Sequence, residues 1–265
     1  MTKTEEIKAG VVSLYESCAF DQLLGETLRP GGLKLTARLA DIAGIGESDS
    51  VLDIACGKGA TAFFLSQEYG CRVIGIDLSD KMISSCRSSA IKQKLTDRVS
   101  FLRVDGENIP FHASSFDVVI SECAFSLLPD KEASIRGIWQ VLKSGGKLMM
   151  TDIILRGEVS KELQSGITFA CCLAGAWRLE EYITLLERSG FRSPYIEDHS
   201  HELGKVGYQL GMTFGSVDKF LDRLPAGPCH RKGETTDSVP ATIKSYQEFI
   251  RRARPGYALI AVTKA

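Results

Sequence analysis

Short apolar runs alternate with amphipathic stretches through the middle of the chain. The runs have the length of buried strands, and the stretches between them have the periodicity of helices. Alternation of this kind predicts an α/β fold with a parallel sheet whose two faces are covered by helices. The predicted strands are residues 51–55, 72–77, 99–104, 116–121 and 147–154, and the predicted helices are 59–69, 80–93 and 131–142.

The segments on either side of this core follow other patterns. A helix predicted over residues 5–28 is interrupted by Arg29-Pro30-Gly31-Gly32, and a second helix is predicted from Leu33 to Ile42. After the core, we predict helices from Ser160 to Ala176 and from Trp177 to Ser189, and strands at 194–198 and 257–263.

About 55 residues separate these last two strands, which is too long for a plain loop. We therefore predict three parts. Residues 1–45 form an N-terminal helical segment that covers the site. Residues 46–199 and 255–265 form the main domain, and residues 200–254 form a helical cap insertion.

A glycine-containing turn follows the first predicted strand. Gly57 and Gly59 let the backbone approach a ligand closely, because glycine has no Cβ. Asp77 ends the second strand, where a carboxylate can accept hydrogen bonds from both hydroxyls of a ribose. Asp53 lies inside the first strand, four residues before Gly57. A carboxylate at this position would not bind an anionic pyrophosphate, but it suits a ligand with a cationic amino acid end. This position therefore argues against a nicotinamide-dependent oxidoreductase.

Composition narrows the class of partner. The formal net charge is −1, so a polyanion-binding surface and a nucleic-acid substrate are not expected. No apolar run is long enough to span a bilayer, and the charged N-terminus lacks a signal core. Eight cysteines in such a chain indicate reduced thiols and a cytoplasmic location.

The run Asp53-Ile54-Ala55-Cys56-Gly57-Lys58-Gly59 resembles motif I of the class I S-adenosyl-L-methionine (SAM) methyltransferases, with Ala55 in place of the first glycine. The resemblance continues in order over roughly residues 50 to 155, through Asp77-Leu78-Ser79 and Asp105-Gly106-Glu107. It implies a Rossmann-like fold with a mostly parallel seven-stranded sheet, an antiparallel last strand and SAM as the cofactor.

The same resemblance implies a role for each matching position. Asp53 and the backbone of the glycine turn hold the aminocarboxypropyl end of SAM. Asp77 takes the ribose, Met82 packs on the adenine, and Asp105 receives the adenine amino group. The expected cofactor-binding residues are Asp53, Ala55, Gly57, Gly59, Asp77, Leu78, Met82, Asp105, Gly106, Glu107 and Ser121.

Two cysteines are candidates for the binding site of the methyl acceptor. Cys123 follows the fourth strand and Cys172 comes 49 residues later, in segments that resemble arsenite methyltransferases. Those enzymes bind trivalent arsenic through thiolates, and soft thiolates suit thiophilic centres. The chain departs from that family at Glu122, where the family has Asn, and at Ala174, where it has glycine. The family's third thiol has no clear match.

The remaining candidates have simpler interpretations. Cys18 and Cys171 are possible substitutes for the third thiol, whereas Cys56, Cys71 and Cys86 are interpreted as buried small hydrophobic residues. Cys229-His230 lacks a second ligand pair at metal spacing, so no metal site is predicted. His199 and His201 are interpreted as surface residues, although one is a possible base for an oxygen substrate. Trp177 is placed in the core, with the wall of the substrate pocket as the alternative.

We therefore expect a methyltransferase that acts on a small molecule, with Cys123 and Cys172 as candidate catalytic residues. The acceptor is either a thiophilic metalloid or thiol compound, or a small organic molecule as in quinone-methylating relatives of this fold. A nicotinamide-dependent oxidoreductase and a non-catalytic SAM-binding protein are the alternatives from other classes. The sequence makes no prediction of the oligomeric state.

Overall fold

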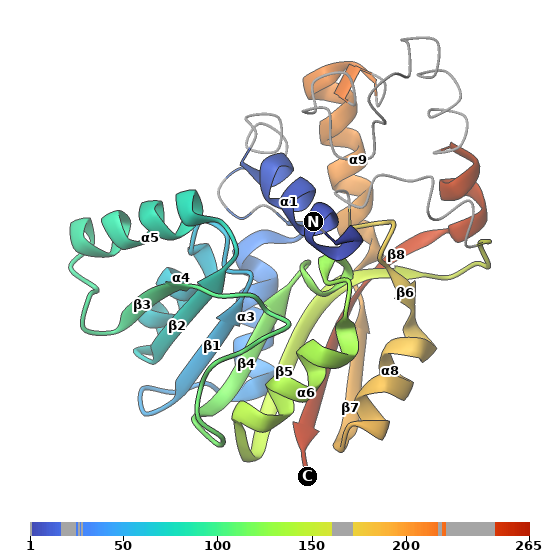
Figure 1. Cartoon of the computed structure of the whole chain (residues 1–265). Helices are drawn as coiled ribbons and strands as arrows, with labels where there is room; N and C mark the ends of the chain where they lie inside the picture. The colour runs from blue at the N-terminus through green and yellow to red at the C-terminus, as the bar shows by residue number, and fades with distance from the viewer. Residues whose placement is uncertain are drawn as a thin grey trace.

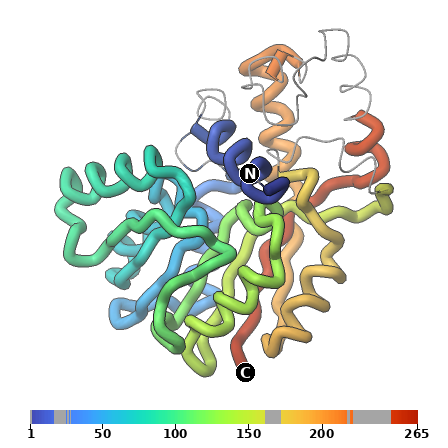
Figure 2. Tube along the Cα trace, viewed as in Figure 1, coloured from blue at the N-terminus to red at the C-terminus, as the bar shows by residue number. Residues whose placement is uncertain are grey.

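The computed structural model describes residues 2–16, 25, 27, 29–160, 172–216, 219–220 and 247–265. These residues form a central sheet with helices on both of its faces, and further helices lie beyond the carboxyl ends of the strands (Figure 1). The tube drawing follows the same path and shows the C-terminus at the opposite edge of the sheet from α1 (Figure 2). The predicted α/β fold class is confirmed.

The sheet has the strand order β3-β2-β1-β4-β5-β8-β7. Strands β1 to β5 run parallel to one another, and β8 is antiparallel to both of its neighbours, as the expected antiparallel last strand. The strand bounds are β1 Ser50–Ile54, β2 Arg72–Asp77, β3 Val99–Arg103, β4 Phe116–Glu122, β5 Leu142–Leu155, β7 Phe191–Asp198 and β8 Pro255–Lys264.

An additional strand distinguishes the observed sheet from the predicted seven-stranded one. Residues Trp177–Arg178 form the short strand β6, which pairs with Ile154 and Leu155 at the end of β5. The sequence predicts a helix from Trp177, and this boundary is wrong because the backbone of these two residues pairs with β5. Helix α8 begins two residues later, at Leu179.

The helices cover the two faces of the sheet with separate apolar clusters. One cluster joins α3, α4 and α5 to the sheet and includes Leu39, Leu65 and Ile83. The other joins α6 and α8 to the opposite face and includes Ile135 and Tyr182. The helix bounds are α1 Lys3–Tyr15, α3 Gly32–Ala43, α4 Ala60–Tyr69, α5 Asp80–Lys92, α6 Lys131–Val141, α8 Leu179–Arg188 and α9 Ser200–Phe214.

Side-chain caps explain where two of these helices begin. The Ser79 hydroxyl accepts a hydrogen bond from the Met82 amide at 3.0 Å and starts α5 just after β2. The Asp130 carboxylate accepts one from the Ala133 amide at 2.8 Å and starts α6. Both caps satisfy amides that a helix leaves unpaired in its first turn. They place the first turns of α5 and α6 close to the carboxyl edge of the sheet.

Several other predicted boundaries differ from the structure. Helix α1 ends at Tyr15, and most of the rest of the predicted helix 5–28 lies outside the described residues. Residues 172–176 are not helical, which corrects the end of the helix predicted from Ser160; residues 161–171 lie outside the described part. Strand β5 begins at Leu142 rather than at 147, because Leu142 pairs with Phe116 across a register shift.

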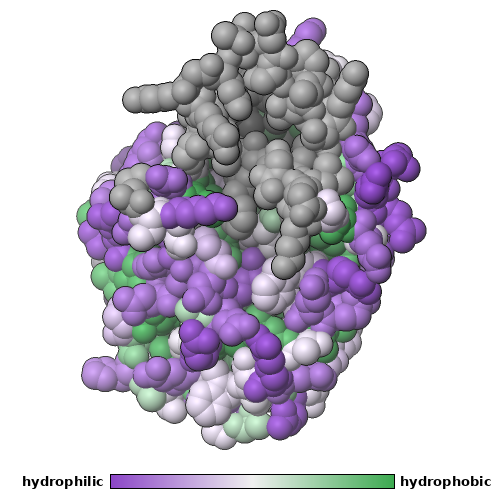
Figure 3. Space-filling view, turned by 45° about the vertical axis from the view of Figure 1, so that its right-hand side comes forward, coloured by the Kyte–Doolittle hydropathy of each residue, from purple (hydrophilic) through white to green (hydrophobic). Residues whose placement is uncertain are grey.

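The described part of the predicted insertion is helical at 200–214, at 219–220 and at 247–253. The division into three parts remains a prediction. Among the described helices, none combines the length and the apolar character that crossing a membrane requires. Figure 3 shows hydrophilic side chains over much of one face, with hydrophobic ones visible between them.

Candidate functional site

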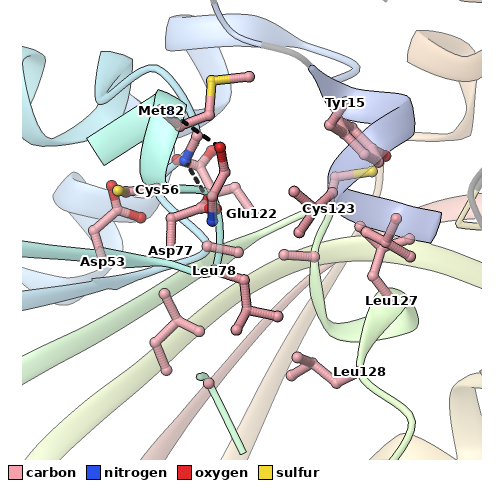
Figure 4. Close-up of a pocket in the computed structure, with 18 of the residues that line it drawn as sticks. Tyr15, Asp53, Cys56, Asp77, Leu78, Met82, Glu122, Cys123, Leu127 and Leu128 are labelled. Atoms are coloured by element: carbon pink, nitrogen blue, oxygen red, sulfur yellow. Dashed lines mark hydrogen bonds between the residues drawn. The ribbon is translucent and has the colours of Figure 1, made fainter. Parts of the chain in front are cut away.

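A cavity lies at the carboxyl edge of the sheet, between the ends of β1, β2 and β4 and the overlying helix α1 (Figure 4). Asp53 and Asp77 lie on one side of it, and Tyr15 and Cys123 lie on the other (Figure 4). This is the edge of a parallel sheet at which α/β proteins bind their ligands.

The structure brings many of the predicted residues to this cavity, but not all of them. The predicted residues that line it are Asp53, Ala55, Gly57, Asp77, Leu78, Met82, Gly106 and Cys123. Gly59, Asp105, Glu107, Ser121 and Cys172 are not among the described lining residues.

The turn after β1 has the backbone conformation that its glycines allow. Gly57 has φ +52° and Gly59 has φ +78°, and Gly59 is the N-cap of α4. Ala55 also has a positive φ, at 57°. An L-residue with a side chain pays roughly 1–2 kcal/mol for this conformation, so the surrounding structure must hold Ala55 in place. Gly59 instead packs away from the cavity, towards Phe101 and Cys86.

Asp53 is a buried carboxyl group with one atom left unpaired. Its exposed fraction is 2%, and its Oδ2 atom has no hydrogen-bond partner among the described residues. Burial raises the pKa of Asp53 well above its ordinary value, and the nearby charge of Glu122 raises it further. A buried acceptor without a partner costs folding free energy. An ammonium group in the cavity would satisfy this atom and favour its ionised form.

Asp77 is held at the end of β2 by two backbone amides. Its Oδ2 accepts a hydrogen bond from the Gly57 amide at 2.9 Å, and its Oδ1 accepts one from the Ser79 amide at 2.9 Å. Burial raises the pKa of Asp77 despite these bonds. The carboxylate is therefore fixed between the glycine turn and the start of α5.

Asp105 and Glu107 contact helix α1 instead of the cavity. Lys8 donates to Asp105 Oδ2 at 2.7 Å and forms a second ion pair with Glu107. Glu107 also accepts a hydrogen bond from the Asp130 amide at 2.7 Å, and its own amide donates to Asp105 Oδ1 at 3.0 Å. Lys8 thus forms an ion pair with Asp105, the carboxylate that the sequence predicts to bind the adenine amino group.

Cys123 and Cys172 lie together although they are far apart in the chain. Their Sγ atoms are 4.0 Å apart, and the Cys172 thiol lies 3.4 Å from the Cys123 carbonyl oxygen. The Tyr15 hydroxyl lies 3.1 Å from Cys172 Sγ. The hydrogen bond with Cys172, together with burial, raises the pKa of the Cys123 thiol well above its ordinary value.

The backbone of both cysteines is in the left-handed region, with φ 55° at Cys123 and φ 60° at Cys172. This conformation is uncommon for a residue other than glycine. Each cysteine therefore holds this conformation at an energetic cost that the surrounding structure must offset.

Several residues of the cavity wall were not predicted from the sequence. Lys8 and Tyr15 come from α1, and Arg29, Thr61 and Glu122 form a buried polar group. No local motif indicates them, because they meet only when distant segments pack together. Arg29 was interpreted as part of a helix break, and Glu122 as a departure from a family pattern.

The remaining candidates fall as follows. Cys71 and Cys86 are buried, as predicted, whereas Cys56 is buried but also lines the cavity. Ser121 is fully buried within β4. His199 contacts Glu197, with 2.9 Å between Nε2 and Oε2, and neither His199 nor His201 is among the described lining residues.

Trp177 is partly buried against the cluster under α8. Cys18, Cys171, Cys229 and His230 lie outside the described residues. Within the described ranges, no group of three potential metal ligands comes together.

The fold and the glycine turn define a Rossmann-like nucleotide-binding protein. A family model described as "Methyltransferase domain" matches residues 45–190. The chain therefore belongs to this methyltransferase family and is a SAM-dependent methyltransferase, as predicted. The match favours methyl transfer over the nicotinamide-dependent alternative.

Two relatives indicate the range of the family. The chain is 30% identical over 266 residues to 27-O-demethylrifamycin SV methyltransferase of Amycolatopsis mediterranei, covering 92% of each chain. It is 29% identical over 165 residues to arsenite methyltransferase of Halobacterium salinarum, covering 60% of this chain and 42% of the relative.

Among solved structures, phosphoethanolamine N-methyltransferase 2 of Haemonchus contortus, in complex with phosphomonomethylethanolamine and S-adenosylhomocysteine, has a TM-score of 0.72 at 22% identity. That likeness covers 93% of this chain and 56% of the Haemonchus chain, and it shows the shared fold. The chain spans little more than half the length of some relatives that it matches, 55% in one from Haemophilus influenzae.

Proposed function

We propose that the protein transfers the methyl group of SAM to a small thiophilic acceptor, a trivalent metalloid or a thiol compound, that binds at Cys123 and Cys172. The observation that carries this proposal is the thiol pair, with 4.0 Å between the sulfur atoms, one of which belongs to a residue of the cavity wall. Two thiolates that one atom holds through bonds of about 2.3 Å, at an angle of about 100–110°, lie about 3.5–3.8 Å apart. The two thiols therefore need to move little for both sulfur atoms to bind one soft atom.

The cavity wall supports a binding mode for the cofactor. The unpaired Asp53 Oδ2 atom fits the ammonium of the amino acid end, and the Asp77 carboxylate fits the ribose. Met82 and Gly106 line the cavity beside these acids and suit the adenine. Asp105 would join them once Lys8 leaves its carboxylate.

The cofactor supplies an electrophilic methyl group on its sulfonium, so the protein mainly provides geometry. Holding a nucleophile in line with that group replaces a bimolecular encounter, which is worth several kcal/mol. The apolar side chains of Leu127 and Leu128 line the acceptor side and limit its water. The raised pKa of Cys123 means that its thiol is protonated at neutral pH. A soft centre displaces this proton when it binds.

A small organic acceptor is the second candidate. It is supported by the relative from Amycolatopsis mediterranei, whose name gives an organic molecule as its acceptor and which matches 92% of this chain. The absence of a third matching thiol in the sequence also favours it. In this case Cys123 would form part of the wall, and neither Cys123 nor Cys172 would bind the acceptor.

Cysteine variants distinguish the two candidates. Release of S-adenosylhomocysteine (SAH) would be measured with arsenite, with a small dithiol, and with a panel of hydroxyl and amine acceptors. For a thiophilic acceptor, Cys123→Ser and Cys172→Ser should each lower turnover at least a hundredfold. Cys71→Ser is the matched control, because Cys71 is buried under α4 and does not line the cavity.

Organic methyl transfer that survives both cysteine substitutions, with no turnover of arsenite or the dithiol by the wild type, would exclude the thiophilic acceptor. Binding of SAM should be retained in all three variants. This binding measurement separates loss of the acceptor site from loss of the fold.

A further inference from the structure

A buried ion pair forms part of the cavity wall. Arg29 Nε lies 2.9 Å from Glu122 Oε2, and each of the two residues is 8% exposed. Both residues line the cavity (Figure 4 labels Glu122). Buried pairs of this kind contribute little net stability, because the desolvation of two charges offsets their attraction. Their presence at a ligand cavity therefore calls for a role other than stability.

Two threonines hold the pair in one orientation. Thr61 donates to Glu122 Oε1 at 2.7 Å and accepts from Arg29 Nη2 at 2.9 Å. Thr36 accepts from Arg29 Nη2 at 2.6 Å and donates to Glu122 at 3.1 Å. Arg29 Nη1 also donates to the Thr27 carbonyl oxygen at 3.0 Å. The guanidinium and the carboxylate thus cannot turn freely, and both charges are presented to the cavity in a fixed position.

This network lies next to the unpaired carboxyl group of Asp53. Arg29, Asp53 and Glu122 line the same cavity, where the charge of Glu122 raises the pKa of Asp53 and the charge of Arg29 lowers it. The amino acid end of the cavity therefore carries two carboxyl groups and one guanidinium. With both acids ionised, this wall has a net negative charge.

The two forms of the cofactor differ in charge at this place. SAM has an ammonium, a carboxylate and a sulfonium, and so carries a net positive charge. SAH keeps the ammonium and the carboxylate but is a neutral thioether at sulfur. A negative wall distinguishes the two only if one of its carboxylates lies near the sulfur, and a guanidinium holds the carboxylate of both forms alike.

We propose that Arg29 binds the carboxylate of the cofactor and that Glu122 makes the site favour the sulfonium of SAM over the thioether of SAH. Glu122 lines the same cavity as Asp53 and directly precedes Cys123 in the chain. The sulfonium must lie between the amino acid end and the acceptor, and Glu122 lines this cavity together with Asp53 and Cys123. The position of the acceptor at Cys123 rests on the proposed function. The consequence is weaker inhibition by the product.

Calorimetric titration with SAM and with SAH tests the two roles separately. Arg29→Gln should weaken binding of both ligands by a similar factor of about ten or more, because both carry the carboxylate. Glu122→Gln keeps the shape and a hydrogen-bond acceptor but removes the charge. This substitution should weaken the binding of SAM about tenfold and the binding of SAH less than threefold. The ratio of the two dissociation constants therefore changes.

Thr36→Val is the matched control. Thr36 contacts both Arg29 and Glu122 but is not among the described lining residues. Its loss loosens the network without removing a charge, so the affinities for SAM and SAH should change by the same factor. Circular dichroism would confirm that each variant is folded.

The proposal is overturned if Glu122→Gln changes both affinities equally, or if Arg29→Gln leaves both unchanged. Wild-type protein offers a test that needs no variant, because the proposal requires it to bind SAM more tightly than SAH. None of these titrations contains an acceptor. A failure of the thiophilic hypothesis would appear in the cysteine variants and would leave these affinities as they are.

Discussion

The hydroxyl of Tyr15 lies 3.1 Å from the Sγ atom of Cys172, although 157 positions separate the two residues. This contact joins helix α1 to the thiol pair. The same helix reaches the other end of the cavity, where Lys8 contacts Asp105. One helix therefore touches both the proposed acceptor site and the loop predicted to contact adenine.

Loss of the Tyr15 hydroxyl should expose Cys172. In Tyr15→Phe, the contact that holds α1 against this thiol is removed, at a cost of about 1 kcal/mol. Alkylation of Cys172 by iodoacetamide, followed by peptide mass spectrometry, should become about fivefold faster. Tyr69→Phe is the control, because its hydroxyl contacts Asp41 outside the cavity. An unchanged rate in Tyr15→Phe would show that the contact does not protect the thiol.

Removing Lys8 should strengthen cofactor binding. Lys8 lies 2.7 Å from the Asp105 carboxylate that we expect to receive the adenine amino group, so the two compete. The part-buried ion pair is worth about 1 kcal/mol, and Lys8→Met should bind SAH about fivefold more tightly. Lys81→Met, which loses a different contact to the end of α1, should not. Weaker binding by Lys8→Met would mean that Lys8 supports the cofactor rather than excluding it.

Asp53→Asn should raise stability and lower affinity together. Burial raises the pKa of Asp53, so the folded protein holds a proton that the unfolded chain releases as pH rises past about 4. This contribution to stability is present at low pH and is lost as pH rises through the folded-state pKa.

At neutral pH, Asp53→Asn should therefore unfold at a higher urea concentration than the wild type. Its affinity for SAM should fall about tenfold, because a neutral amide replaces the partner of the ammonium. A variant that keeps the wild-type affinity would remove Asp53 from the binding site.

The titration of Lys131 should make the free energy of unfolding rise between pH 8 and pH 10. Burial lowers its pKa from 10.5 to about 8, although its Nζ atom donates to the Leu128 carbonyl oxygen and lies 5.2 Å from the centre of the Trp177 ring. The unfolded chain holds the proton in this range and the folded protein releases it, so stability increases with pH by at most about 3 kcal/mol. Lys131→Met should lack this rise in urea unfolding, and an identical pH profile would refute the assignment.

Gly59→Ala should destabilise the protein more than its φ angle alone explains. A Cβ atom at Gly59, which has φ +78°, would lie 3.0 Å from the Phe101 and Phe63 rings and 3.1 Å from Cys86 Sγ. Gly145 has φ +74° but open space around it. In urea unfolding, the free energy of unfolding should fall by about 1 kcal/mol in Gly145→Ala and by about 2–4 kcal/mol in Gly59→Ala. Equal losses would mean that the rings move aside easily.

The central strands and their glycine turn could be predicted from the sequence because their signals are local. The apolar runs at 51–55 and 72–77 differ from β1 and β2 by one residue at most. Runs of this length have few alternatives to a buried strand. The acids Asp53 and Asp77 follow from these strands, since parallel strands bring their carboxyl ends to one edge.

The rest of the site depended on contacts between distant segments. Arg29 meets Glu122 across 93 positions, and Lys8 meets Asp105 across 97. No spacing within either segment indicates its partner, because these pairs form only when α1 and the start of α3 pack over the sheet. Strand β6 was missed for the same reason, since its two residues pair with the end of β5.

The amino-acid sequence by itself determined the alternating fold, the turn after β1 and the acids at two strand ends. Each of these follows from periodicity or from the conformational freedom of glycine within a few neighbouring residues. Tertiary packing alone decided which charges share the cavity wall, which thiols come within 4.0 Å, and that Lys8 holds Asp105. These relationships depend on burial and on distances across the fold, and no local pattern in the chain contains that information.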